Sequence, residues 1–236
     1  MQFDSGNLAA FYGSALGQVT RRLIHRRLKA IWPNLRGTRV LGLGFAVPYL
    51  RAFALDAERT IALIPEDLGP FCWPAQRSLS TIAEEELFPF PDALFDRILL
   101  IHGLEAAQSV RPFMRQVWRV LAPEGRLLIV APNRTSLWAQ VDRSPFAHGR
   151  PFSRGQLDRL LRDNMFVPER WDTGLLLPPI NARRLVRTGT AWERGGKILW
   201  PRLAGIHLVE ATKSMYALAP IRKPRRLKPV LAPARA

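Results

Sequence analysis

The sequence predicts an α/β protein with an open, mostly parallel sheet that is covered by helices on both faces. Two observations support this fold class. Apolar runs, such as those within the segments 95–101 and 127–130, are typical of strands that are buried on both faces of a parallel sheet. Amphipathic helical segments, the clearest at 110–121, alternate with these runs, and such alternation is typical of sheets flanked by helices.

The elements follow in order along the chain. Apolar residues at steps of three and four predict one helix over 8–31, which carries basic residues on a different face and ends before Pro33. A later helix opens at Ser153, where the S-x-x-Q pattern with Gln156 predicts a capping box. The predicted strands lie at residues 40–43, 61–64, 79–82, 95–101, 127–130 and 206–218.

Length and charge divide the chain into three parts. We expect a basic amphipathic helix packed on the domain (1–34), one domain (35–219) and a disordered, basic, proline-rich tail (220–236). The net charge is +16, and the tail holds six basic residues and no acidic one. The tail therefore predicts an anionic partner, either nucleic acid or an acidic membrane surface, although a GC-rich genome would produce the same excess of arginine.

Several classes of protein are disfavoured. No apolar run approaches the roughly 20 residues that a transmembrane helix needs. Cys72 is the only cysteine, so neither an intrachain disulfide nor a cluster of thiolate metal ligands is expected. We expect a cytoplasmic protein that holds no metal.

Three segments occur in an informative order: VLGLGFA (40–46), LFPFPDALFDRILLIHGLE (87–105) and FMRQVWRVLAPEGRLLIVAPNR (113–134). Together they resemble the class I S-adenosylmethionine-dependent methyltransferases of the type 11 branch. In that family an LPFPD-x-x-FD segment leads into the fourth strand, and R-V-L-x-P-G-G-R-L leads into the fifth. The resemblance covers roughly residues 35–135. It implies a Rossmann-like methyltransferase fold with an antiparallel C-terminal strand, and S-adenosyl-L-methionine as the cofactor.

The cofactor loop of the family reads approximately D-x-G-x-G-x-G, and this chain departs from it. The acidic position falls on Gly42, the first glycine on Gly44, the second on Ala46 and the third on Pro48. Glycines there allow positive φ and a close approach of the backbone to the ligand. The resemblance makes Gly42, Gly44, Phe45 and Ala46 candidates for cofactor binding, in a loop that has lost its carboxylate and two of its glycines.

Two further acidic positions of the family contact the ribose and the adenine. At the end of the second strand, where the ribose acid is expected, the chain has Ile64 and Pro65, and Glu66 reaches the place only if the strand is longer. Glu84 and Glu85 are the candidates for the adenine end, and the alternative for this acidic run is a solvated turn.

His102 follows the fourth predicted strand and is the candidate for cofactor contact and for general-base catalysis. Ligands of open α/β sheets lie outside the carboxyl ends of the strands, and Glu105 is near enough to orient the ring. The alternative is a histidine that only packs there. His148 and Arg150 follow the fifth strand; they are either contacts for a substrate carboxylate or phosphate, or part of a surface loop.

Three hypotheses for function remain. The first is an S-adenosylmethionine-dependent methyltransferase that acts on a small or lipid-like molecule. The second is a catalytically impaired protein of the same fold that serves as an interaction or regulatory subunit. The third is an RNA-binding methyltransferase, although the segment APNR (131–134) lacks the [ND]-P-P-[YF] pattern of many amino-group methylases of nucleic acids.

Overall fold

The computed structural model describes residues 3–74, 76, 78–141, 144–179, 196 and 203–214. It contains a seven-stranded sheet in the order β3-β2-β1-β4-β5-β7-β6. The strands are β1 (Arg39–Gly44), β2 (Arg59–Pro65), β3 (Ser80–Ala83), β4 (Phe95–Ile101), β5 (Leu121–Pro132), β6 (Phe166–Gly174) and β7 (Ile206–Lys213). Neighbouring strands are parallel except for β7, which runs antiparallel to both β5 and β6. The predicted fold class is confirmed.

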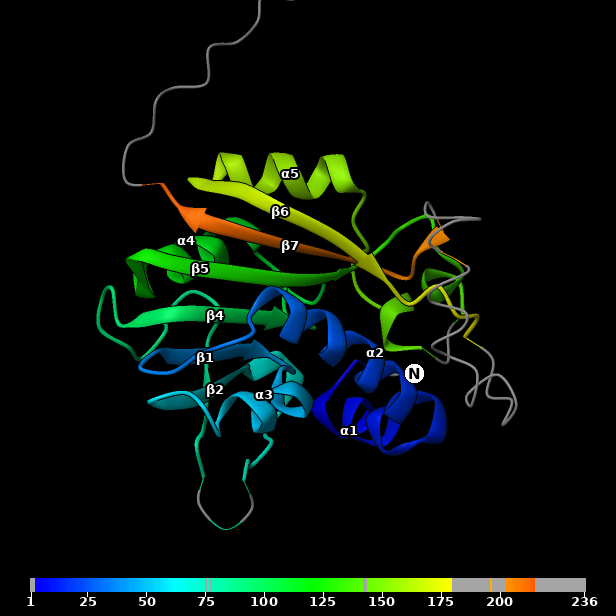
Figure 1. Cartoon of the computed structure of the whole chain (residues 1–236), viewed down its shortest axis with the longest axis horizontal. Coiled ribbons are helices and arrows are strands. Elements are labelled where there is room, and N and C mark those ends of the chain that lie inside the picture. The colour runs from blue at the N-terminus through cyan, green and yellow to red at the C-terminus, as the bar shows by residue number, and fades with distance from the viewer. Residues whose placement is uncertain are drawn as a thin grey trace, which may run out of the picture.

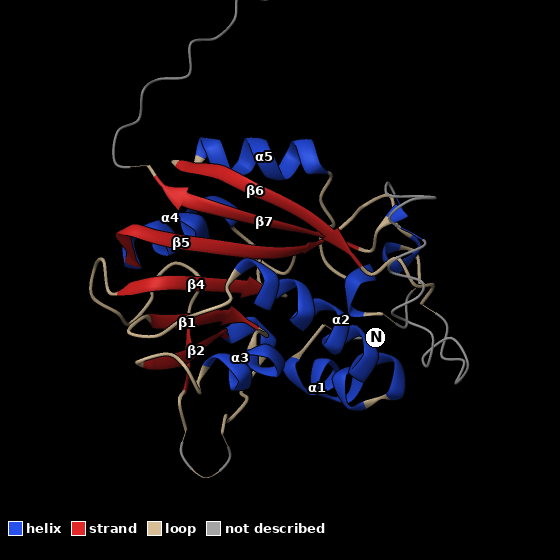
Figure 2. Cartoon of the chain, in the orientation of Figure 1, coloured by secondary structure: helices blue, strands red, loops and turns tan. Residues whose placement is uncertain are grey.

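Helices cover both faces of this sheet (Figures 1 and 2). The helices α1, α2 and α3 lie on one face, α4 lies on the other, and α5 runs beside the edge strand β6. Their bounds are α1 (Ser5–Gly13), α2 (Ala15–Ile31), α3 (Val47–Phe53), α4 (Val110–Val120) and α5 (Arg154–Asp163), with short 3-10 helices η1 (Glu66–Leu68), η2 (Leu137–Ala139) and η3 (Pro145–Ala147).

The two faces form two separate cores, which explains the continuous apolar runs of the central strands. In β4, Leu99 and Ile101 pack into the cluster beneath α1, α2 and α3, whereas Ile98 and Leu100 pack into the cluster beneath α4 and α5. Successive side chains of a strand point to opposite faces, so the part of β4 that has cores on both sides, residues 98–101, is apolar at every position.

The N-terminal segment differs from the prediction of a single helix over 8–31. The chain breaks at Ser14, which adopts an extended conformation (φ −71°, ψ 162°) and caps α2 by accepting a hydrogen bond from the N–H of Gly17. A Cβ on Gly17 would lie 1.9 Å from the carbonyl oxygen of Phe11, so the end of α1 packs directly on the start of α2. The break places α1 beside the carboxyl ends of the parallel strands (Figure 1).

Some predictions fall outside the described residues. The tail 220–236 is one, and the last part of the strand predicted over 206–218 is another, since the description ends at residue 214. Among the described residues, no helix is both long enough and apolar enough to cross a membrane.

Candidate functional site

The centre of the site is His102, which follows β4 and is fully buried. Its backbone has a φ of +55°, a strained conformation for a residue with a side chain and one that recurs at functional sites. Its Nδ1 lies 3.0 Å from Oε1 of Glu105, which is also buried. The carboxylate only accepts, so Nδ1 donates to it, and in the neutral imidazole Nε2 then presents a lone pair. Glu105 therefore orients the ring of His102, as predicted.

The second partner of His102 comes from α1. The hydroxyl of Tyr12 lies 2.8 Å from Nε2 of His102, and the hydroxyl of Tyr49 in α3 donates to that of Tyr12 at 3.1 Å. Burial, reinforced by Tyr49, raises the pKa of Tyr12 well above its usual value, so the phenol keeps its proton. The hydrogen bonds thus run in one direction, from the α3 hydroxyl to the carboxylate that follows β4.

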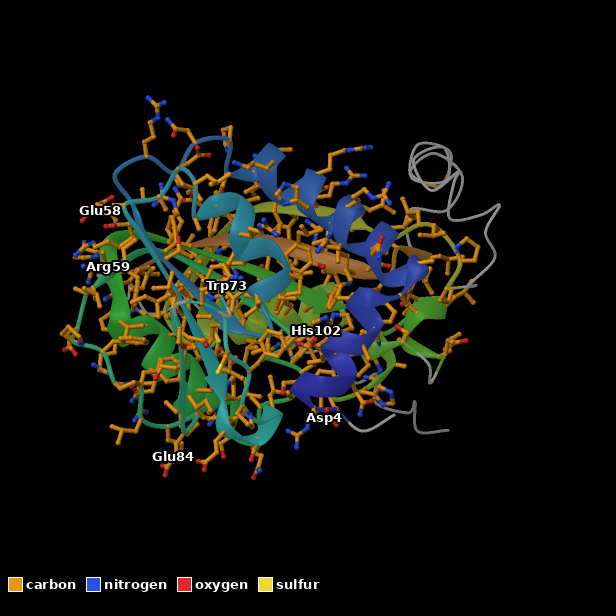
Figure 3. All side chains as sticks on the ribbon, turned by 90° about the horizontal axis from the view of Figure 1, so that it is seen from below. Asp4, Glu58, Arg59, Trp73, Glu84 and His102 are labelled. Carbon is orange, nitrogen blue, oxygen red and sulfur yellow. The ribbon has the colours of Figure 1, made fainter. Side chains whose placement is uncertain are left out.

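Aromatic rings of the N-terminal segment cover the carboxyl ends of the parallel strands. The ring of Tyr12 stacks on that of Phe45 in the loop after β1, with centroids 6.2 Å apart and planes at 16°. Phe45 and Ala46 are each 1% exposed and His102 is 0% exposed. Figure 3 shows His102 beside the first helix, which begins just after Asp4. In this conformation α1 separates the glycine loop from solvent.

The loop itself is packed tightly against the end of β4. Gly44 has a φ of +78°, and the N–H of Phe45 donates to the carbonyl of Ile101 at 2.8 Å. A Cβ on Gly44 would lie 2.3 Å from that carbonyl oxygen and 2.7 Å from the N of Gly103. Gly44 is therefore required both for its backbone angle and for the close approach of two strand ends.

The altered positions of the loop have structural substitutes. A Cβ on Gly42 would lie 2.4 Å from Cδ1 of Leu50, a fully buried side chain of α3, so Leu50 fills the space that an acidic side chain at position 42 would enter. Ala46 has helical angles (φ −78°, ψ −10°) and needs no glycine. Pro48 lies in the first turn of α3, where its missing N–H loses no helical hydrogen bond.

The acidic candidates line a separate cleft of about 180 Å³ at the ends of β2 and β3. β2 ends at Pro65, one residue beyond its predicted end, so Glu66 follows it directly and lines the cleft. Glu84 and Glu85 line it from the end of β3, and Gln108 closes it before α4. Glu66 and Glu84 are exposed (Figure 3 labels Glu84), whereas Glu85 is only 9% exposed.

Glu85 has one satisfied and one unsatisfied oxygen. Its Oε2 accepts a hydrogen bond of 3.0 Å from the N–H of Gln108, but its buried Oε1 has no partner among the described residues. Burial raises the pKa of Glu85, because the charged form is poorly solvated, and the backbone N–H groups of Gln108 and Ser109 oppose this only in part. Glu85 therefore brings an unpaired, buried acceptor to the wall of the cleft.

The candidates thus fall into two groups. The loop residues and His102 lie together beneath α1, and the three glutamates lie together in the open cleft. Tyr12, which bonds to His102, and Tyr49, which donates to Tyr12, were not predicted from the sequence. The only signal was that Tyr12 lies on the apolar stripe of its helix. Within the described ranges, no group of three His, Cys, Asp or Glu side chains could hold a metal ion.

Comparisons with known proteins agree with the resemblance. A family model described as a methyltransferase domain, of type 11, matches residues 74–129. The fold is that of a class I methyltransferase. No curated protein sequence matches the chain.

Three solved structures show the similarity. A SAM-dependent methyltransferase from Archaeoglobus fulgidus has a TM-score of 0.59 at 19% identity, over 82% of this chain and 94% of that one. An S-adenosylmethionine-dependent methyltransferase from Mesorhizobium loti has a TM-score of 0.56 at 15% identity, over 86% and 100%. A Haloferax volcanii protein, solved in complex with the Trm112 methyltransferase activator, has a TM-score of 0.59 at 16% identity, over 88% and 96%. At these identities the likeness establishes the fold.

Proposed function

We propose that this protein is an S-adenosyl-L-methionine-dependent methyltransferase that acts on a small-molecule acceptor, and that α1 leaves the strand ends when the cofactor binds. The observation that supports this most is the free Oε1 of Glu85 in an acid-lined cleft at the ends of β2 and β3. The resemblance places the ribose and adenine contacts of the cofactor at these strand ends. When bound, the cofactor would supply an electrophilic methyl group.

The adenosine half of the cofactor fits this cleft. Adenine carries an exocyclic amino group, which is the donor that the free oxygen of Glu85 lacks. Ribose carries two hydroxyl groups, and Glu66 supplies a carboxylate directly after β2. Both halves of the adenosine would therefore meet acceptors from neighbouring strands.

The methionine half does not fit while α1 stays in place. The resemblance places it beside Gly44 and Phe45, where the ring of Tyr12 now lies. Burial of such a ring contributes about 1.5–3 kcal/mol, and each of its hydrogen bonds contributes about 1 kcal/mol. Withdrawal of Tyr12 therefore costs about 3.5–5 kcal/mol, which would weaken cofactor affinity by a few hundredfold or more.

Withdrawal of Tyr12 would also free the lone pair of His102 Nε2. The imidazole would then be able to accept a proton at Nε2, and the carboxylate of Glu105, hydrogen-bonded to Nδ1, would stabilise the resulting positive charge. The same displacement would thus open the site and prepare a base.

Calorimetry with S-adenosylhomocysteine tests this function. We expect Tyr12→Ala to bind the ligand at least about tenfold more tightly than the wild type, because the variant no longer loses the stacking and hydrogen bonds of the ring. Phe113→Ala is the matched control, since Phe113 is a fully buried ring on the opposite face of the sheet. Binding by neither the wild type nor Tyr12→Ala would overturn the proposal.

The second candidate is an interaction or regulatory protein with a methyltransferase fold. It is favoured by the side chain of Leu50 in the place of the family's acid and by Tyr12 in the place of a ligand. One structural neighbour was solved together with an activator protein, so a protein partner is compatible with this fold. This candidate predicts no heat with S-adenosylhomocysteine in any variant. An RNA-binding role remains the third hypothesis and depends on the tail.

A further inference from the structure

A second cleft, of about 640 Å³, lies beside α5 and is rich in arginine. Arg111 comes from the first turn of α4, Arg134 from the segment after β5, Arg150 from the segment before α5, and Arg159 from α5 itself. Four separate parts of the chain therefore bring guanidinium groups to one place. Among the described residues that line the cleft, Asp163 is the single carboxylate.

Within the described part of the chain, these four guanidinium groups have no protein partner. Among the described residues, none of them donates a side-chain hydrogen bond or forms an ion pair, whereas other arginines nearby do. Arg119 in α4 pairs with Asp92, and Arg162 in α5 pairs with Asp158. Because these helices do pair some of their arginines, the unpaired set in the cleft is not simply a result of low acidic content.

The local backbone adds to the positive potential of the cleft. Arg111 lies in the first turn of α4, a helix whose first turn contains no acidic residue. The N-terminal end of a helix carries a partial positive charge, so an arginine there is unfavourable unless an anion is near. Together the four side chains repel one another, and a bound anion would remove that cost.

This cleft adjoins the candidate site. Gly149 and Arg150 line both the arginine cleft and a neighbouring cleft of about 590 Å³, which also contains Phe3 and Glu105. The N–H of Arg150 donates to the carbonyl of Glu105 at 2.9 Å, and a Cβ on Gly149 would lie 2.3 Å from that oxygen. The arginine cleft is therefore joined rigidly to the residue that orients His102.

We propose that the arginine cleft binds the phosphate group of a small phosphorylated molecule; that this molecule is the methyl acceptor rests on the proposed function above. Planar guanidinium groups bind phosphate oxygens in a bidentate manner. The cleft is lined by four arginines and by one carboxylate, that of Asp163. A ligand with a single carboxylate would therefore leave most of the positive charge uncompensated. A phosphomonoester carries about −1.5 to −2 charges, and a diphosphate carries more, which matches the cleft better.

Calorimetric titration of the full chain with pyrophosphate, at constant ionic strength and without cofactor, tests this site. We expect saturable one-site binding that weakens at least about tenfold in Arg134→Gln and in Arg159→Gln, because each loses a charge-assisted hydrogen bond. Arg162→Gln is the matched control: it lies on α5, one turn from Arg159, and is paired with Asp158 outside the cleft lining. We expect its affinity to stay within about twofold of the wild type.

The absence of saturable pyrophosphate binding would overturn the proposal, and so would an equal loss in Arg162→Gln. A second arm uses a short single-stranded RNA. If the RNA binds through the same arginines and pyrophosphate does not displace it, the surface is a nucleic-acid interface and the proposal is wrong. Since the titration contains no S-adenosyl compound, failure of the methyltransferase proposal would leave the anion site intact. Circular dichroism confirms that each variant is folded.

Discussion

The hydroxyl of Tyr12 and Nε2 of His102 lie 2.8 Å apart, although 90 residues separate them in the sequence. This contact joins the N-terminal helix to the end of β4 and satisfies a buried imidazole that would otherwise lack a donor. It also fills the place beside the glycine loop that the resemblance assigns to the cofactor. Under the proposed function, this one side chain therefore stabilises the position of α1 and opposes binding of the cofactor.

Removal of the Tyr12 hydroxyl should destabilise the protein. Tyr12→Phe keeps the ring but leaves Nε2 of His102 without a donor, so we expect the free energy of unfolding to fall by about 1–3 kcal/mol. Tyr49→Phe is the control, because it removes only the hydrogen bond to Tyr12 and leaves His102 paired. Urea denaturation measures both. Equal losses in the two variants would contradict the assigned direction of the hydrogen bonds.

Positions 42 and 50 should be energetically coupled. Gly42→Ala places a methyl group 2.4 Å from Cδ1 of Leu50, and Leu50→Ala alone leaves a cavity that costs about 2–5 kcal/mol. In the double variant the added methyl group occupies part of that cavity, so we expect the two losses to be less than additive by about 1 kcal/mol or more. Gly155→Ala is the control, because nothing lies within 4 Å of its added Cβ.

Thermal and urea unfolding of the wild type, the two single variants and the double variant give the coupling free energy. Additive losses would show that Leu50 moves aside without cost and does not fill the place of the missing acid. They would also weaken the case for the second candidate function.

The sequence predicted the fold well where strands are buried on both faces. β4 was predicted with the bounds that it has, 95–101, since both of its faces are apolar. β6 (Phe166–Gly174) was not predicted, because this edge strand is largely polar and only partly buried, and so has no continuous apolar run. β5 begins at Leu121 rather than 127, because Leu121 pairs with Phe95 ahead of a shift in register.

The site was predictable only in part. The order of motifs located the loop, the glutamates and His102, and Glu105 is near in sequence. The role of Tyr12 was not predictable, since the apolar stripe of its helix is compatible with packing on either face of the sheet. It depends on the break at Ser14, and no proline or glycine occupies that position.

Glu85 should lower the stability of the folded protein and raise its affinity for the ligand. The pKa of Glu85 is raised in the folded protein. Above that pKa the buried carboxylate is charged, and its charge opposes folding. We expect Glu85→Gln to be more stable than the wild type at pH 7, with the difference shrinking as the pH falls toward 4.5, the usual value. The same variant should lose affinity for S-adenosylhomocysteine. Glu84→Gln, an exposed neighbour, should leave stability unchanged.

His207 should make the folded protein lose stability at pH values above the usual pKa range of carboxyl groups. Burial, and then the positive charge of Arg154, lower the pKa of His207 from 6.5 to about 4, and neither of its buried ring nitrogens has a partner in the described ranges. Between these two values the unfolded chain binds the proton more readily than the folded one. The contribution of His207 to stability is therefore fully present above pH 6.5 and decreases as the pH falls toward 4.

We expect this residue to account for about 2–3 kcal/mol of unfolding free energy lost between pH 7 and pH 4. His207→Leu should flatten that part of the profile, as measured by urea denaturation at a series of pH values. In the variant the unfolding free energy should still fall with decreasing pH, but less steeply, because partial burial also lowers the pKa of His25. Identical pH profiles for the wild type and His207→Leu would show that the imidazole finds a partner in solution, since a neutral buried ring without one must resist protonation.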